Sequence, residues 1–123
     1  MSEIQPRRQY DLEARTLAFA RGVRQFVARL CKTQANIEDG GQLIRSSGSV
    51  GANYIEANEA LSKKDFAMRA KICRKEAKES RYWLDIIDTG KDGALETDRK
   101  RWRQEADELT KIFGAIVEKT KPS

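Results

Sequence analysis

Residues 66–84 read FAMRAKICRKEAKESRYWL, and their spacing decides the fold expected for the whole chain. Apolar or small residues recur at alternating steps of four and three, from Phe66 to Leu84. That rhythm places one stripe along a single side of an α-helix and leaves the basic residues on the opposite side. The segment therefore predicts an amphipathic helix that buries one face.

The same rhythm occurs in three further segments, so four core stripes are expected. Their positions are Leu12, Thr16, Phe19, Val23, Phe26 and Leu30; Leu43, Ser47, Val50, Tyr54, Ala57 and Leu61; Phe66, Ala70, Cys73, Ala77, Ser80, Leu84 and Ile87; and Trp102, Ala106, Leu109, Phe113, Ile116 and Thr120. A repeat of 3.5 residues favours left-handed crossing at about 20°. Short connections make neighbouring helices antiparallel. The sequence predicts an all-α, antiparallel, up-and-down, left-handed four-helix bundle.

Turn-forming residues predict breaks at residues 33–41, 59–62 and 89–93. Ser62 followed by Asp65 is typical of a helix N-terminus, because the serine oxygen can accept an otherwise unpaired backbone N–H. Gly90 and Gly93 suit a left-handed helix ending. With 123 residues the chain has the length of one domain. We expect a flexible segment at residues 1–9, the bundle at 10–120 and a tail at 121–123.

The composition argues against an enzyme and against a membrane protein. The chain has no histidine, and its two cysteines, Cys31 and Cys73, form no CxxC pair, so zinc ligation and a cysteine nucleophile lack the usual partners. Both cysteines are expected to be reduced core residues. No apolar run approaches the roughly 20 residues of a membrane helix, and the N-terminus lacks a signal-type apolar region. We expect a cytoplasmic protein with no catalytic residues, cofactor or metal.

Residues 46–53 read SSGSVGAN, which is a poor helix by intrinsic propensity. An interior glycine costs about 1 kcal/mol relative to alanine, and serines compete for backbone hydrogen bonds. One interpretation is that small side chains let another helix approach closely. The alternative is an anion site lined by backbone, although the GxxxxGK[ST] phosphate motif is absent.

Polar residues lie beside the second core stripe and are expected to form a structural polar network if they are half-buried. The members are Arg45, Asn53, Glu56, Asn58 and Glu59, with Arg69, Arg74 and Lys75 as further partners. An oligomer interface and catalytic or metal-binding carboxylates are the alternatives. A diiron bundle would need Glu-x-x-His pairs, which a chain without histidine cannot supply.

Positive charge is concentrated between Lys63 and Arg81, where eight basic residues face three acidic ones; this excess equals the chain's net charge of +5. Lys64, Lys71, Lys75 and Lys78 share one helix side with Met68 and Tyr82, and this set is called the basic stripe. It is either a solvated outer face or a surface for a phosphate backbone or an acidic protein. The candidate binding residues are Lys64, Lys71, Arg74, Lys75, Lys78, Arg81 and Tyr82. Any nucleic-acid contact should be electrostatic and tolerant of sequence.

Three stretches carry a family resemblance: IRSSGSVGANYIEA at 44–57, SKKDF at 62–66 and RKEAKESRYWL at 74–84. They resemble the bacterial four-helix bundle protein family, also called 23S rRNA intervening-sequence proteins, and the likeness runs from Tyr10 through the fourth helix. The resemblance implies a ring-shaped homopentamer, often encoded within intervening sequences of ribosomal RNA genes, mostly without an assigned activity. It implies no catalytic residues.

A related branch is similar to the accessory variability proteins of diversity-generating retroelements, which assist a reverse transcriptase and carry a basic surface for nucleic acid. The YDLE opening at 10–13 and the RKEA segment at 74–77 look nearer to the intervening-sequence type. We therefore expect a non-enzymatic, homo-oligomeric binding or scaffold protein that binds RNA or DNA through its basic stripe. The alternative is a purely structural oligomeric adaptor that recruits a protein partner.

Overall fold

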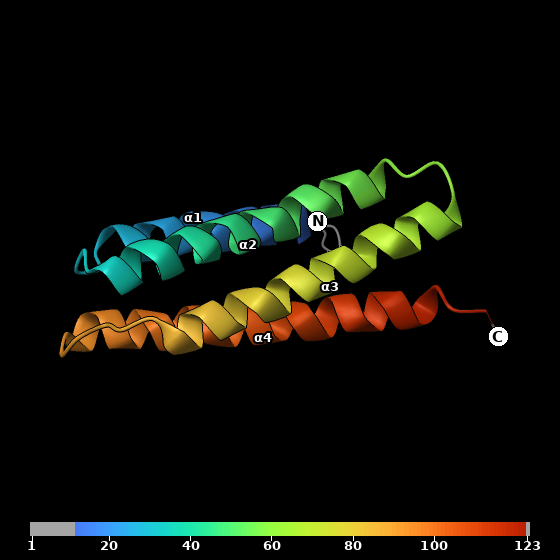
Figure 1. The fold of residues 1–123 in the computed structure, drawn as a ribbon. Helices are drawn as coiled ribbons and strands as arrows, with labels where there is room; N and C mark the ends of the chain where they lie inside the picture. The colour runs from blue at the N-terminus through green and yellow to red at the C-terminus, as the bar shows by residue number, and fades with distance from the viewer. Residues whose placement is uncertain (1–11, 123) are drawn as a thin grey trace, which may run out of the picture.

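The computed structural model describes residues 12–122 and consists of four helices in a bundle (Figure 1). They are α1 (Leu12–Ala28), α2 (Gln34–Asn58), α3 (Lys63–Ile86) and α4 (Gly93–Lys119). Successive helices run in opposite directions, and the described residues contain no strand. The predicted all-α four-helix architecture is confirmed. The flexible segment predicted at residues 1–9 lies outside the described residues.

Each helix packs against the next along the chain, and α4 returns to contact α1. Among the described residues, the α1–α4 contact is the smallest of the four. Figure 1 shows α2, α3 and α4 continuing past the described part of α1 at the end where the C-terminus lies. This end of the bundle is called the open end.

The predicted core stripes supply most of the buried side chains. All six positions of the first predicted stripe are buried, although Leu30 lies just beyond the end of α1, and Phe19, Phe26 and Phe113 are among the largest fully buried side chains. One position was wrong: Leu61 is 99% exposed. It lies beyond the end of α2 at Asn58, so the helical rhythm no longer applies to it.

The first predicted break was placed too far along the chain. The connection spans residues 29–33 and α2 begins at Gln34, where the Thr33 side chain accepts a hydrogen bond from the Asn36 backbone N–H at 3.1 Å. Gly40 lies inside α2 and faces α1, since a Cβ on residue 40 would lie only 3.0 Å from the Val27 side chain. This glycine serves a close helix contact, which sequence alone could not distinguish from a turn.

The second break lies at 59–62 as predicted, and the third spans 87–92 where 89–93 was predicted. The Ser62 side chain accepts a hydrogen bond from the Asp65 backbone N–H at 3.0 Å and caps α3. Gly90 has φ +66°, the left-handed conformation expected of it. Gly93 does not end a helix; it begins α4, which Asp92 caps by accepting from the Leu95 N–H at 3.0 Å.

Small residues of α2 bring it close to both neighbours, as one interpretation of residues 46–53 predicted. A Cβ at Gly51 would lie 2.8 Å from the Thr16 hydroxyl oxygen of α1. On the α3 side the hydroxyls of Ser46 and Ser80 are hydrogen-bonded at 2.8 Å, and both residues are buried. Helix packing therefore compensates for the weak intrinsic helicity of this stretch.

The two cysteines occupy different environments. Cys73 is fully buried between α2 and α3, its thiol donates to the Val50 carbonyl at 3.4 Å, and burial raises its pKa to about 12. Cys31 is exposed in the α1–α2 connection, so its prediction as a core residue was wrong. Because α1 ends at Ala28, Cys31 does not lie on the buried face of that helix. Both thiols are free.

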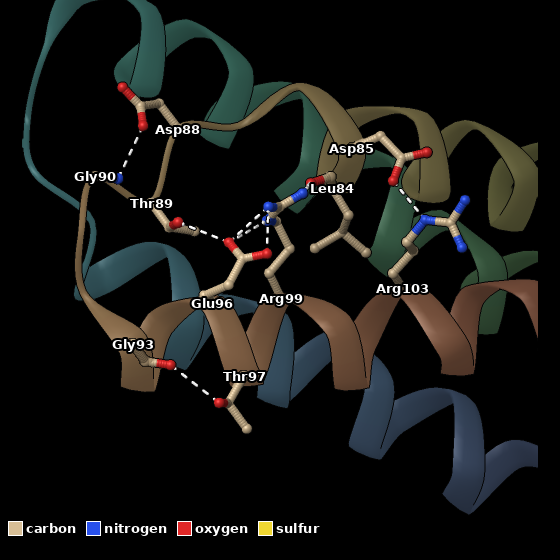
Figure 2. A network of polar contacts seen from close by, with 10 residues as sticks. All are labelled: Leu84, Asp85, Asp88, Thr89, Gly90, Gly93, Glu96, Thr97, Arg99 and Arg103. Carbon is tan, nitrogen blue, oxygen red and sulfur yellow. Dashed lines mark hydrogen bonds and ion pairs between the residues drawn. The ribbon is translucent and has the colours of Figure 1, made fainter.

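Polar side chains close the end of the bundle opposite the open end. Thr89 donates to Glu96 at 2.9 Å, and Glu96 also accepts from Arg99, whose guanidinium reaches the Leu84 carbonyl at 3.5 Å (Figure 2). The Asn36 side chain donates to the Cys31 and Asp88 carbonyls, linking the two connections at this end. We call it the closed end.

Two glycine variants of α2 test the close packing. Gly51→Ala should lower the free energy of unfolding by about 1–3 kcal/mol, because its methyl group would collide with Thr16. Gly41→Ala should raise it by up to about 1 kcal/mol, since nothing lies within 4 Å of a Cβ there and alanine favours helix. Urea unfolding followed by circular dichroism measures both. Equal effects of the two changes would contradict the packing described.

Candidate functional site

The basic stripe lies along the outer face of α3. Its four lysines are exposed, and Met68 and Tyr82 are 49% and 58% exposed. The opposite side of the same helix carries the buried residues Ala70, Cys73, Ala77, Ser80 and Leu84. The amphipathic pattern of the sequence thus fixes the orientation of α3, with its lysines facing outward.

The lysines of the basic stripe have no carboxylate partner among residues 12–122. The ion pairs recorded in that part of the chain join arginines and other lysines to acids, and none involves Lys64, Lys71, Lys75 or Lys78. The stripe is therefore a row of exposed lysines that form no salt bridge with another described residue.

Arg74 and Arg81 lie on the flank of α3 that faces α4, away from the basic stripe. The Arg81 guanidinium donates to Asp107 of α4 at 2.8 Å and holds the pKa of that carboxyl below its usual range. The Arg74 side chain lies against Gly114 of α4, with its Cδ 3.7 Å from where a Cβ would be. The structure thus separates these two arginines from the four lysines with which they were grouped.

An aromatic pair lies at the end of the basic stripe. Tyr82 and Trp83 meet edge to face with centroids 5.1 Å apart. The Trp83 indole N–H donates to Glu79 at 3.1 Å, and the ring is half-buried against the core. Trp83 therefore supports a tyrosine ring that remains largely open to solvent, as stacking on a base would require.

The polar residues expected to form a network on α2 do not come together. Asn53 accepts from Arg69 of α3 at 3.0 Å, but Arg45 donates to Gln42 on its own helix, and Asn58 donates to Glu13 of α1. Glu56 and Glu59 are exposed and form no ion pair with another described residue. Of the expected network only the Asn53–Arg69 pair forms, because Val50 and Ala57 turn inward and leave Glu56 on the outer side of α2.

The structure also contains a groove that the sequence analysis missed. It lies at the open end, has a volume of about 1140 Å³, and is called the end groove. Its lining residues are Leu12, Arg15, Tyr54, Lys63, Phe66, Ile112, Ala115, Ile116, Lys119, Thr120, Lys121 and Pro122. No pattern in the sequence indicated it, because it combines side chains from all four helices.

Residues 12–122 hold no cluster of three or more histidine, cysteine, aspartate or glutamate residues able to bind a metal ion. Within the same range no helix is both long and apolar enough to cross a membrane. The candidate surfaces are therefore the basic stripe and the end groove.

The family model described as 23S rRNA-intervening sequence protein matches residues 9–115, which include all of the basic stripe and most of the bundle. The chain belongs to this family. The family resemblance inferred from the sequence is thereby confirmed.

A crystal structure of a protein of unknown function from the S23 ribosomal protein family of Bacteroides thetaiotaomicron VPI-5482 is similar to this bundle. The two share 27% sequence identity with a TM-score of 0.73, over 86% of this chain and 97% of the other. Comparison with curated proteins gives no significant match. The match to the family model establishes the family, and the similarity to the solved structure supports the four-helix architecture.

The stripe lysines repel one another, and this has a measurable effect on stability. Lys71 has Lys75 one turn ahead of it, so Lys71→Gln should raise the free energy of unfolding by a few tenths of a kcal/mol at low salt. The gain should vanish near 1 M salt, which screens the repulsion. As the matched control, Lys111→Gln should not stabilise, since Lys111 pairs with Asp107 at 3.3 Å. Chemical unfolding at two salt concentrations distinguishes the outcomes.

Proposed function

We propose that this member of the family is a non-enzymatic, homo-oligomeric binding or scaffold protein whose basic stripe binds RNA or DNA without sequence specificity. The observation that carries the proposal is the row of four exposed lysines without acidic partners in residues 12–122. A helix rises 1.5 Å per residue, so Lys64 and Lys78 lie about 21 Å apart along α3. That length matches roughly six phosphates of one strand.

The chemistry of the basic stripe supports backbone recognition without base readout. Lysine ammonium groups act as point charges on phosphates, and phosphate contacts carry no direct sequence information. Tyr82 adds one exposed ring at the end of the row, and aromatic rings stack on any base. Single-stranded or flexible nucleic acid suits this arrangement best, because a base must leave its own stack to reach the tyrosine.

A homo-oligomer would strengthen such a weak contact. One stripe offers only a few phosphate contacts, whereas linked copies of the stripe bind one strand with a higher effective concentration. We propose the ring-shaped homopentamer that the family resemblance implies. The exposed free thiol of Cys31 also suits a reducing compartment, which supports a place in the cytoplasm.

The non-enzymatic role is proposed because of how the residues that could have taken part in catalysis are arranged. The chain has no histidine. Arg45, Glu56 and Glu59 do not line the end groove, and Arg45 donates to Gln42 and to neither glutamate. The second candidate function is an adaptor that recruits a protein. It is favoured by exposed apolar side chains outside the basic stripe, including Leu17 and Ile55, each 51% exposed.

Nucleic-acid binding is tested with a labelled single-stranded RNA of mixed sequence, followed by fluorescence anisotropy from about 50 to 200 mM salt. The triple variant Lys71→Gln, Lys75→Gln and Lys78→Gln should bind at least about tenfold more weakly. Its salt slope should fall by about 2, since each lost contact to a single strand accounts for about 0.7. DNA of the same sequence should behave similarly.

The matched control removes three exposed lysines elsewhere, with Lys91→Gln, Lys100→Gln and Lys111→Gln. It changes the net charge equally, so it should weaken binding by less than about threefold if the basic stripe is the contact. Equal losses in the two triple variants, or no RNA binding by the unaltered protein at about 50 mM salt, would refute the proposal.

The oligomeric state is tested separately by light scattering coupled to size exclusion. The expected mass is five times the 14.0 kDa of one chain. A monomer at high protein concentration would exclude both the oligomeric scaffold and the oligomeric adaptor. A stable assembly without RNA binding would favour the adaptor.

A further inference from the structure

A row of apolar side chains runs along α3 beside the lysines, on the flank that faces α2. Arg69 marks this flank, because its guanidinium donates to Asn53 of α2 at 3.0 Å. Five residues follow Arg69 at steps of three and four and therefore lie on the same flank: Ile72, Glu76, Glu79, Trp83 and Ile86. Met68 lies one turn before Ile72. The apolar row consists of Met68, Ile72, Trp83 and Ile86.

The apolar row is open to solvent at both of its ends. Met68 is 49% exposed and Ile86 is 43% exposed, while Ile72 and Trp83 are half-buried. The exposed ring of Tyr82 packs edge to face on Trp83 and so connects the row to the lysines. The outer face of α3 therefore offers apolar contacts directly beside its positive charges.

Charge is distributed unevenly across this face. The three acidic residues between Lys63 and Arg81 all lie on the flank toward α2, and they are Asp65, Glu76 and Glu79. Arg74 and Arg81 lie on the opposite flank, toward α4. The neighbouring α2 carries three acidic residues and a single arginine. A phosphate backbone is therefore repelled from the α2 side and attracted to the lysines.

The length of the row favours a polymer over a single nucleotide. Met68 and Ile86 lie about 27 Å apart along the axis of α3, and the four lysines span about 21 Å of the same helix. One nucleotide covers only a small part of that length. A strand of several nucleotides reaches the lysines and both exposed ends of the apolar row.

We propose that the partner of the basic stripe is an unpaired single strand, whose phosphates follow the lysines while its bases turn toward α2 and pack on Tyr82 and the apolar row. This inference rests on the proposed function and narrows it to one class of nucleic acid. A duplex keeps the faces of its bases stacked inside and presents mainly its backbone to such a surface. A single strand can splay its bases onto aromatic and apolar side chains.

The test compares three fluorescein-labelled DNA probes of about 12 nucleotides, within the usual site size of single-strand binding surfaces. They are a single strand of mixed sequence, the same strand annealed to its complement, and a base-free strand with the same number of phosphates. Anisotropy at about 50 mM salt measures each affinity. The single strand should bind at least about fivefold more tightly than the base-free strand. It should also bind more tightly than the duplex, whose higher charge density would win if only lysines made contact.

A double variant locates the bases. Met68→Gln with Ile86→Gln removes apolar contacts and no charge, so it should weaken single-strand binding at least about fivefold. Affinity for the duplex and the base-free strand should stay within about twofold, and the salt slope should not change, because the slope counts phosphate contacts.

The matched control is Leu17→Gln with Ile55→Gln, which removes two apolar side chains of similar exposure from α1 and α2. It should leave the affinity for all three probes within about twofold, since neither residue lies on α3. Circular dichroism confirms that both double variants fold.

Three results would overturn this inference and leave the proposed function standing. They are equal affinity for the single strand and the base-free strand, tighter binding of the duplex, or unchanged single-strand affinity in the folded Met68 and Ile86 double variant. No binding of any probe would refute the proposed function as well. Binding of an acidic peptide of leucine and glutamate, without binding of any DNA probe, would assign this face to a protein partner.

Discussion

The close contact of α2 with both of its neighbours is the constraint on which the rest of the structure depends. Glycine at position 51 leaves room for Thr16, and the buried hydroxyls of Ser46 and Ser80 are each other's hydrogen-bond partners. A larger side chain on either side would separate the helices and leave polar groups unpaired in the core. With α2 fixed, the small residues Ala70, Cys73 and Ala77 of α3 face inward, and the lysines of α3 are turned toward solvent.

Sequence patterns correctly predicted the features that are determined within a single helix. The core stripes of α1 and α3, the serine cap at Ser62 and the outward face of the α3 lysines all follow from spacing along a single helix. Leu61 and Cys31 were misplaced because the rhythm was continued past the residues where helices end. Gly40 was misread because its role depends on Val27 of another helix.

Properties that depend on several helices could not be predicted in the same way. Arg81 was grouped with the stripe lysines because it is basic and nearby in sequence, but its partner Asp107 comes from α4. The expected network on α2 depends on partners from neighbouring helices, and residue spacing along one helix does not predict where those partners lie. The end groove combines side chains of all four helices, and no local pattern brings these together.

The polar contacts of the closed end give the two ends of the bundle different resistance to local unfolding. There, Asn36 joins two connections, and Glu96 binds both Thr89 and Arg99. The open end has half-buried apolar side chains, among them Phe66 and Ile116. We therefore expect local opening to cost less at the α2–α3 connection than at the closed end, and backbone amides there to exchange with solvent sooner. A protein built in this way can reshape one end while the other preserves its fold.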